Sequence, residues 1–216
     1  MNVSIVGYTL NPVGVCGKAA AVCTASDNYR VALAGAMAAG HESIIEHASF
    51  TFRIENVSRV LLAQLTRHRI ASFSVESQRY VKGSGLTTVV PSSIASDPDL
   101  AEMFETVHAA ASQFYNQCLA KGVEPEDARY GLLMGGTTNL IMTMNARELR
   151  HFFELRTCNR AQWEIRELAD RLLAEVEAVA PELFNGAGCA CMQGKPCPEG
   201  KKSCGHPRTR DEIAKY

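Results

Sequence analysis

The sequence predicts a mixed α/β protein in which short strands alternate with longer helices. Phe50, Phe52 and Ile54 alternate with polar residues, which is the period of a strand that buries one face. Two long segments, 97–121 and 146–179, begin at capping residues and end at Gly or Pro, as helices do. Because strands recur between these helices and no internal repeat is visible, we expect a mixed α/β fold.

The first third of the chain is expected to hold two strands, a turn and two helices. Asn-Pro-Val-Gly is typical of a turn, Asp27 is a capping residue, and Gly40 is a common residue at the end of a helix. The elements are, in order, a strand at 3–8, a turn at 11–14, a helix from Asp27 to Ala39, the alternating strand at 50–55 and a helix from about residue 58.

The chain beyond residue 80 is expected to be mainly helical. Asn145, followed three residues later by Glu148, has the spacing of a helix N-cap. Low helix propensity at 157–159 marks the place where the last helix is expected to bend. The elements are a short strand at 87–90, a helix from 97 to about 121, a short helix at 124–129, a strand at 137–144 and a helix from 146 to about 179.

The composition is that of a globular protein without a strongly charged surface. The chain has 216 residues, of which 46% are hydrophobic and 21% charged, and its net charge is −1. This charge argues against a nucleic-acid polymer as partner, because such partners select a basic face. No apolar run approaches the roughly 20 residues that span a bilayer, and the N-terminus does not resemble a signal peptide. We therefore expect a cytoplasmic protein whose eight cysteines are reduced.

The stretch from Arg67 to Tyr80 is the strongest candidate for a binding site. It follows the apolar end of a helix and places Arg67, His68 and Arg69 before a run of hydroxyl, amide and acid side chains. Cations at a helix C-terminus are often solvated residues that complement the helix dipole. The polar residues that follow show neither a helical nor a strand period, which favours a loop that binds a small polar ligand.

Two further clusters have both a functional and a bland interpretation. His41, Glu46 and His47 suggest a metal site, although their spacing differs from the zinc helix motif, and polar surface residues are the alternative. Arg147 and His151 lie four residues apart on one helix face, where they either flank a planar or phosphorylated ligand or form an exposed polar stripe.

Residues 185–216 differ from the rest of the chain, and we expect a C-terminal extension to a domain formed by 1–184. The extension contains Cys189, Cys191, Cys197, Cys204 and His206 but few large apolar residues. Four thiols and an imidazole suit a structural zinc ion, yet their spacing matches no strong zinc-finger template. Reduced, solvent-facing thiols are the alternative.

Two motif regions resemble those of the flavin-dependent thymidylate synthases. In the first, Arg67-His68-Arg69 is followed after seven residues by Ser77, and Arg79-Tyr80 comes two residues later. In the second, Asn145-Ala146-Arg147 precedes Leu155-Arg156 and then 161–165. The resemblance covers about residues 30–184. The chain departs from the family pattern at Ser74, Val75 and His151.

This resemblance implies a central, mostly antiparallel sheet with flanking long helices. It also implies the reductive methylation of dUMP to dTMP, with FAD as cofactor and with NADPH and 5,10-methylenetetrahydrofolate as co-substrates. The family implies a homotetramer with shared active sites and no metal. An active cysteine nucleophile is not part of this chemistry.

The resemblance also assigns residues to roles. For catalysis these are Arg156, Ser77 and His41, with Ser77 as a positioning hydroxyl. For dUMP they are Gln64, Arg67, Ser77, Gln78, Arg79, Arg129 and Arg156, with Arg129 reaching the site of a neighbouring subunit. For FAD they are Ser43, Glu46, Arg67, His68, Arg69, Ile70, Asn145, Arg147 and His151.

Three other functions fit parts of the sequence. A nucleic-acid-binding module would use the arginines at 67, 69 and 79, and the net charge argues against it. A metal-dependent hydrolase would use His41, Glu46 and His47. A protein that binds flavin or nucleotide without turnover would share the motifs, and only an assay would separate it from a synthase.

Overall fold

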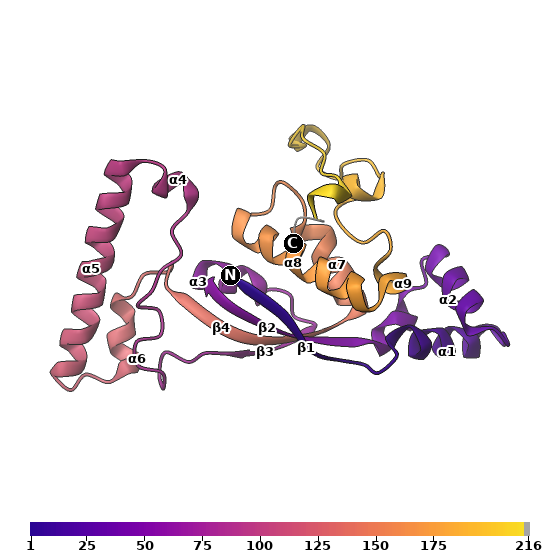
Figure 1. Cartoon of the computed structure of the whole chain (residues 1–216), viewed down its shortest axis with the longest axis horizontal. Helices are drawn as coiled ribbons and strands as arrows, with labels where there is room; N and C mark the ends of the chain where they lie inside the picture. The colour runs from indigo at the N-terminus through magenta and orange to yellow at the C-terminus, as the bar shows by residue number, and fades with distance from the viewer. Residues whose placement is uncertain (214–216) are drawn as a thin grey trace. The chain divides into compact units, whose positions relative to one another are not determined.

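A computed structural model describes residues 1–213 and confirms the mixed α/β fold (Figure 1). The chain divides into two compact units. Unit 1 contains Met1–Asn2, Ile54–Arg67 and Ser74–Leu140, and unit 2 contains Val3–Arg53, His68–Phe73 and Ile141–Tyr216.

A four-stranded antiparallel sheet has the strand order β1-β2-β4-β3, and each strand contributes residues to both units. The expected alternation in β2 is confirmed, because Phe50, Phe52 and Ile54 are all fully buried. The strands are β1 (Asn2–Tyr8), β2 (Ser49–Ser58), β3 (Ala71–Val75) and β4 (Thr137–Asn145).

Unit 1 contains one long helix and several short ones. Asp97 caps α5 by accepting hydrogen bonds from the backbone N–H groups of Asp99 and Leu100, and Tyr115 is the fully buried aromatic residue of this helix. The helices of unit 1 are α3 (Arg59–Leu65), α4 (Ser92–Ala95), α5 (Pro98–Ala120), α6 (Pro125–Ala128) and the 3₁₀ turn η2 (Arg129–Gly131).

Unit 2 places helices over its part of the sheet and around an aromatic core. Phe184 packs edge-on against Phe50 and Phe153, with ring centroids 5.4 and 6.0 Å away. The helices of unit 2 are α1 (Pro12–Thr24), α2 (Tyr29–Ala38), η1 (Glu42–His47), α7 (Ala146–Arg156), α8 (Trp163–Val179) and α9 (Pro181–Phe184).

The turn expected at 11–14 is wrong, because this segment begins helix α1. The Asn11 side chain accepts a hydrogen bond of 3.0 Å from the Gly14 backbone N–H, and Pro12 occupies the first helical position. The next helix is confirmed with a shifted start, since Asn28 rather than Asp27 caps α2.

Two strand assignments also change. The segment expected to be a loop after Arg69 contains strand β3, whereas the strand expected at 87–90 is reduced to a single antiparallel bridge between Thr88 and Gly136. Strand β3 lies at one end of the strand order. Its sequence Ala-Ser-Phe-Ser-Val does alternate, with Ala71, Phe73 and Val75 half-buried and the serines exposed, but the run is only five residues long and the sequence analysis missed it.

The continuous helix expected from 146 to 179 is two helices. Helix α7 ends at Arg156, the completely buried Thr157 follows it, and α8 begins at Trp163 after Gln162, which caps it. The low-propensity residues 157–159 therefore end a helix rather than bend it. The Asn145 cap is confirmed, since its side chain accepts a hydrogen bond of 2.9 Å from the Glu148 N–H.

The extension folds back as three 3₁₀ turns, η3 (Ala190–Gln193), η4 (Gly200–Lys202) and η5 (Arg210–Glu212). Cys189, Arg208 and Ile213 are buried within it. The expectation of solvent-facing thiols is thus wrong for Cys189.

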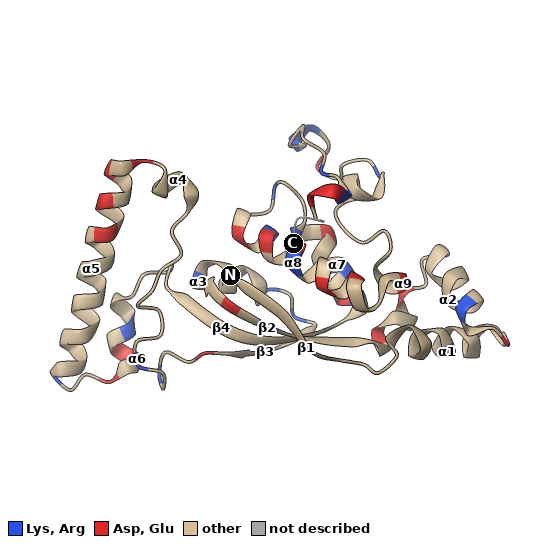
Figure 2. Ribbon diagram, viewed as in Figure 1, with Lys and Arg blue, Asp and Glu red and all other residues tan. Residues whose placement is uncertain are grey.

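Charges of both signs are interspersed along α7 and α8, whereas acidic residues gather on the first half of α5 (Figure 2). These helices therefore lack the uniformly basic face that a nucleic-acid polymer selects. Across residues 1–213, no helix is both long and apolar enough to cross a bilayer.

Candidate active site

A cavity of about 510 Å³ lies in unit 2, where η1, the start of α7 and the extension come together. Five of the residues assigned to FAD from the sequence motifs line it. The lining residues are Glu42, Glu46, Ile70, Asn145, Arg147, Glu148, Arg150, His151, Glu154, Ala187, Gln193 and Lys195.

Other residues assigned to FAD lie away from this cavity wall. Ser43 and Arg69 are exposed and His68 is buried, and none of the three lines the cavity. Arg67 is the last residue of the unit 1 segment that contains α3, whereas His68 and Arg69 belong to unit 2. The arginine–histidine–arginine triplet therefore contributes residues to both units.

Two arginines of α7 form ion pairs with two glutamates of η1. Arg147 donates to Glu46, which raises the pKa of its guanidinium, and Arg150 lies 3.1 Å from a Glu42 carboxylate oxygen. The Arg147 and Glu46 side chains are about half exposed, so their pair is weak and readily exchanged for another anion. Arg150 also donates to the carbonyl oxygens of Leu183 and Asn185, which gives it a structural role.

A buried chain of hydrogen bonds connects Glu148, His68 and Arg156. Arg156 Nε lies 3.2 Å from His68 Nε2, and His68 Nδ1 lies 3.3 Å from Glu148 Oε1. Burial, with the nearby Arg156 and His151 charges, lowers the pKa of His68 to about 4, so the imidazole is neutral at neutral pH. A guanidinium can only donate, so His68 Nε2 accepts and Nδ1 carries the proton that is donated to Glu148.

This chain fixes the orientation of Arg156. The pKa of Glu148 is raised by burial, and the residue is anchored at the first turn of α7. The rings of Phe152 and His68 pack edge to face, with centroids 4.9 Å apart. The Nε of Arg156 is therefore oriented by a neutral, buried imidazole.

A second cavity of about 880 Å³ lies beside the first and is mostly enclosed by the extension. Arg156, Cys158 and Arg160 line it together with all four cysteines of the extension and His206. His151, Glu154 and Lys195 line both cavities. The extension thus contributes walls to both cavities, which motif reasoning did not predict.

Unit 1 brings together several residues assigned to the nucleotide. Arg79 Nε lies 2.7 Å from a carboxylate oxygen of Glu126, and Arg129 Nε donates 3.0 Å to the Glu126 carbonyl oxygen. Ser77 Oγ accepts a hydrogen bond of 3.2 Å from the Arg79 N–H. Glu126 therefore contacts both arginines at the start of α6, Arg79 through its carboxylate and Arg129 through its backbone carbonyl.

The remaining nucleotide candidates are less grouped. Gln78 is buried and donates 3.1 Å to the Ser84 carbonyl oxygen, while Gln64 is half-buried on α3. Arg156 belongs to unit 2. His41 is exposed just before η1 and lines neither cavity.

Within residues 1–213, no group of three or more histidine, cysteine or acidic side chains is arranged to hold a metal ion. No such group therefore supports the interpretation of His41, Glu46 and His47 as the metal site of a hydrolase. In the extension, the Cys189 and Cys191 sulfurs approach to 3.3 Å, and burial raises the pKa of Cys189 to about 11.

Sequence reasoning missed seven residues of the first cavity. Glu148 had a visible signal as the partner of the Asn145 cap, but its contact with His68 joins residues 80 positions apart. No local pattern indicated the contribution of the extension. The missed residues are Glu42, Glu148, Arg150, Glu154, Ala187, Gln193 and Lys195.

The fold and these cavities define a mixed α/β protein with two adjoining cavities, each lined by both cations and glutamates, that suit planar, phosphorylated ligands. The chain belongs to the family of the thymidylate synthase complementing proteins, whose model matches residues 4–182.

Relatives are similar over nearly the whole chain. A flavin-dependent thymidylate synthase of Geobacter sulfurreducens is 45% identical, with 95% of this chain and 94% of the relative aligned. One of Clostridium tetani is 40% identical over 99% of this chain and 96% of the relative, so its aligned region includes the extension.

Solved structures share the fold. A flavin-dependent thymidylate synthase of Helicobacter pylori, complexed with FAD and dUMP, has 27% identity and a TM-score of 0.67 over 87% of this chain and all of that one. A UMP/dUMP methylase of Streptomyces cacaoi, at 24% identity, has a TM-score of 0.75 over 87% of this chain and 95% of its own.

Proposed function

We propose that the protein catalyses the reductive methylation of dUMP to dTMP, with 5,10-methylenetetrahydrofolate as carbon donor and NADPH as reductant. Family membership supports this reaction, and the relatives are named for it. The structural observation that carries the proposal is Arg156, whose guanidinium is oriented by neutral His68 at the wall of the second cavity.

Arg156 has the chemistry that the uracil ring requires. C5 of the ring becomes nucleophilic when negative charge on the pyrimidine is stabilised, and a guanidinium is a permanent planar cation that can do so. Its Nε donates to the neutral imidazole of His68, and this hydrogen bond orients the guanidinium. A guanidinium that is already oriented has little reorganisation left when charge develops.

The first cavity has the donor set that FAD requires. Arg147 and Lys195 supply cations for phosphates, Asn145 and His151 supply polar contacts, and Ile70 supplies an apolar surface for a planar ring. The weak Arg147–Glu46 pair lets a phosphate replace the carboxylate at small cost. Bound FAD supplies the redox chemistry of the reaction.

In unit 1, the residues around Glu126 suit a nucleotide monophosphate. Arg79 would supply one guanidinium for the phosphate and Arg129 of a neighbouring subunit a second, while Ser77 and Gln78 would position the nucleotide. Ser77 has no general base among its described contacts, so it is a positioning hydroxyl rather than a nucleophile.

We further propose that the protein acts as a cytoplasmic homotetramer in which Arg129 serves the site of a neighbouring subunit. The reduced state expected for its cysteines is consistent with this compartment.

An anaerobic absorption experiment tests the proposal. The purified protein should show flavin absorption, and NADPH should bleach it faster when dUMP is present. A protein that neither contains FAD nor binds added FAD would contradict the proposal. A protein that binds FAD and dUMP but forms no dTMP would be a binding protein without turnover.

A further inference from the structure

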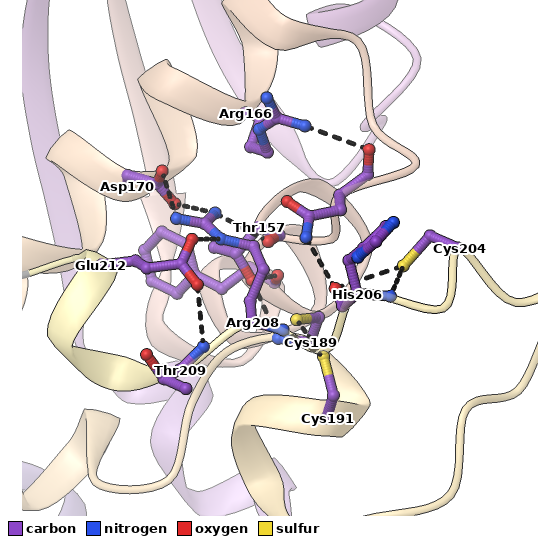
Figure 3. Close-up of polar contacts among 12 residues, drawn as sticks. Thr157, Arg166, Asp170, Cys189, Cys191, Cys204, His206, Arg208, Thr209 and Glu212 are labelled. Atoms are coloured by element: carbon purple, nitrogen blue, oxygen red, sulfur yellow. Dashed lines mark hydrogen bonds and ion pairs between the residues drawn. The ribbon is translucent and has the colours of Figure 1, made fainter.

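The C-terminal extension contacts the turn that directly follows Arg156. Thr157, the next residue, is completely buried, and both of its oxygen atoms accept hydrogen bonds from the extension. The Cys189 backbone N–H donates 2.8 Å to Thr157 Oγ1, and Arg208 Nη1 donates 2.9 Å to the Thr157 carbonyl oxygen (Figure 3). The last turn of α7 is thus anchored from outside the helix.

Arg208 is itself held rigidly. Its guanidinium forms a two-pronged ion pair with Asp170 of α8, at 2.9 and 3.0 Å, while Nε donates 3.0 Å to Glu212. Arg208 and Asp170 are 5% and 3% exposed, so solvent screens this pair little. A fork of fixed geometry therefore connects α8, the extension and the residue after Arg156.

The linker between α7 and α8 has a second set of contacts with the extension. Asn159 donates 2.7 Å to the His206 carbonyl oxygen, and Arg166 donates 3.0 Å to the Asn159 carbonyl oxygen. A helix C-terminus leaves carbonyl groups without helical partners, and such ends fray unless other groups bind them. Here the extension supplies the hydrogen-bonding groups at the end of α7, directly after Arg156.

We propose that the extension is part of the active site, and that Arg208 is a positioning residue that orients Arg156 through Thr157. This inference rests on the proposed role of Arg156 in dUMP methylation. Arg208 does not touch the substrate. It fixes the helix end from which the Arg156 guanidinium extends, while His68 accepts the hydrogen bond of the Arg156 Nε.

Arg208→Lys tests this role with little loss of charge. A lysine can still pair with Asp170, but it cannot chelate both carboxylate oxygens and bond Thr157 at the same time. We expect kcat/KM for dUMP to fall about 10- to 100-fold, because displacement of a catalytic group by about 1 Å has effects of that size. The dissociation constant for dUMP, measured by calorimetry, should rise as well.

Arg210→Ala is the matched control. Arg210 lies two residues away in the same extension and also pairs with α8, through Glu177, but Thr157 is not its partner in that pair. Its kcat/KM should stay within about twofold of wild type. A double-mutant cycle separates positioning from general stability, because Arg208→Lys should cause no further loss when Arg156 is already changed to Lys.

Two results would overturn the inference: a folded Arg208→Lys protein with unchanged kcat/KM, or losses that add fully in the double mutant. If Arg208→Lys does not fold, Asp170→Asn replaces it, because it weakens the ion pair that holds the Arg208 guanidinium against the Thr157 carbonyl; a smaller fall in kcat/KM is then expected, and an unchanged value would overturn the inference. Wild-type protein that binds dUMP but forms no dTMP would contradict the proposed function alone, since the binding measurements still test the role of Arg208.

Discussion

The Glu148–His68–Arg156 chain predicts a large loss of stability for one substitution at Glu148 and a small loss for another. Glu148→Ala removes the acceptor of the His68 Nδ1 proton, whereas Glu148→Gln retains an oxygen that can accept it. Both variants remove the carboxylate charge. A difference between them therefore reports the hydrogen bond and not the charge.

The structure sets the size of the effect. His68 and Glu148 are 5% and 8% exposed, so a donor without its acceptor is cut off from water. Such a buried donor costs about 1–3 kcal/mol. We expect Glu148→Ala to lower the free energy of unfolding by about 2 kcal/mol, and Glu148→Gln to lower it by less than about 1 kcal/mol.

Thermal unfolding of flavin-stripped protein, followed by far-UV circular dichroism, measures this difference. For a chain of this size about 2 kcal/mol corresponds to a fall of about 4–8 °C in Tm. Glu148→Ala should also lower kcat with FAD and dUMP saturating, since His68 then holds Arg156 less firmly. Equal losses of Tm in the two variants would refute the hydrogen-bond chain.

Three further predictions concern single residues. Lys195→Ala should raise the Kd for FAD by roughly 3- to 10-fold, because Lys195 is a cation of the extension that lines the first cavity, and this increase in Kd should be smaller at high salt. Fluorescence titration measures the Kd, and an unchanged value would contradict the assignment of the first cavity to FAD. Iodoacetamide labelling at pH 8, read by peptide mass spectrometry, should modify exposed Cys23 well before buried Cys189, whose pKa is raised to about 11; the reverse order would show that the extension is open. The pKa of His68 is lowered to about 4 in the folded protein, so as the pH falls below about 6.5 the unfolded chain takes up the proton first, and the stability that His68 contributes is lost between pH 6.5 and 4. The difference in Tm between wild type and His68→Phe, measured across this pH range, should therefore shrink as the pH falls. A constant difference would refute a neutral His68 imidazole.

Local patterns were sufficient for much of the fold. Asp97 and Asn145 are side chains that cap the helix they precede, so α5 and α7 began where predicted. The alternation in β2 likewise follows from one buried face. The turn predicted at Asn11 was wrong because Asn-Pro occurs both in turns and at the start of helices, and the residues beyond Gly14 determine which of the two forms.

Long-range contacts explain what the sequence did not predict. The break after Arg156 is stabilised by Cys189 and Arg208, which lie 32 and 51 residues from Thr157. The contribution of Lys195 to both cavities has the same origin, because it depends on how the extension folds back. Motifs located residues of the site, but only the fold showed how they are supported.

The transfer of the labelled carbon to dUMP tests the central claim most directly. Purified protein would be incubated with FAD, NADPH, dUMP and ¹³C-methylene-labelled 5,10-methylenetetrahydrofolate, and the nucleotides would be analysed by mass spectrometry. We predict dTMP that carries the label in its methyl group, and no dTMP when NADPH or the folate is omitted. Unchanged dUMP, from protein shown to contain FAD and to bind dUMP, would contradict the account.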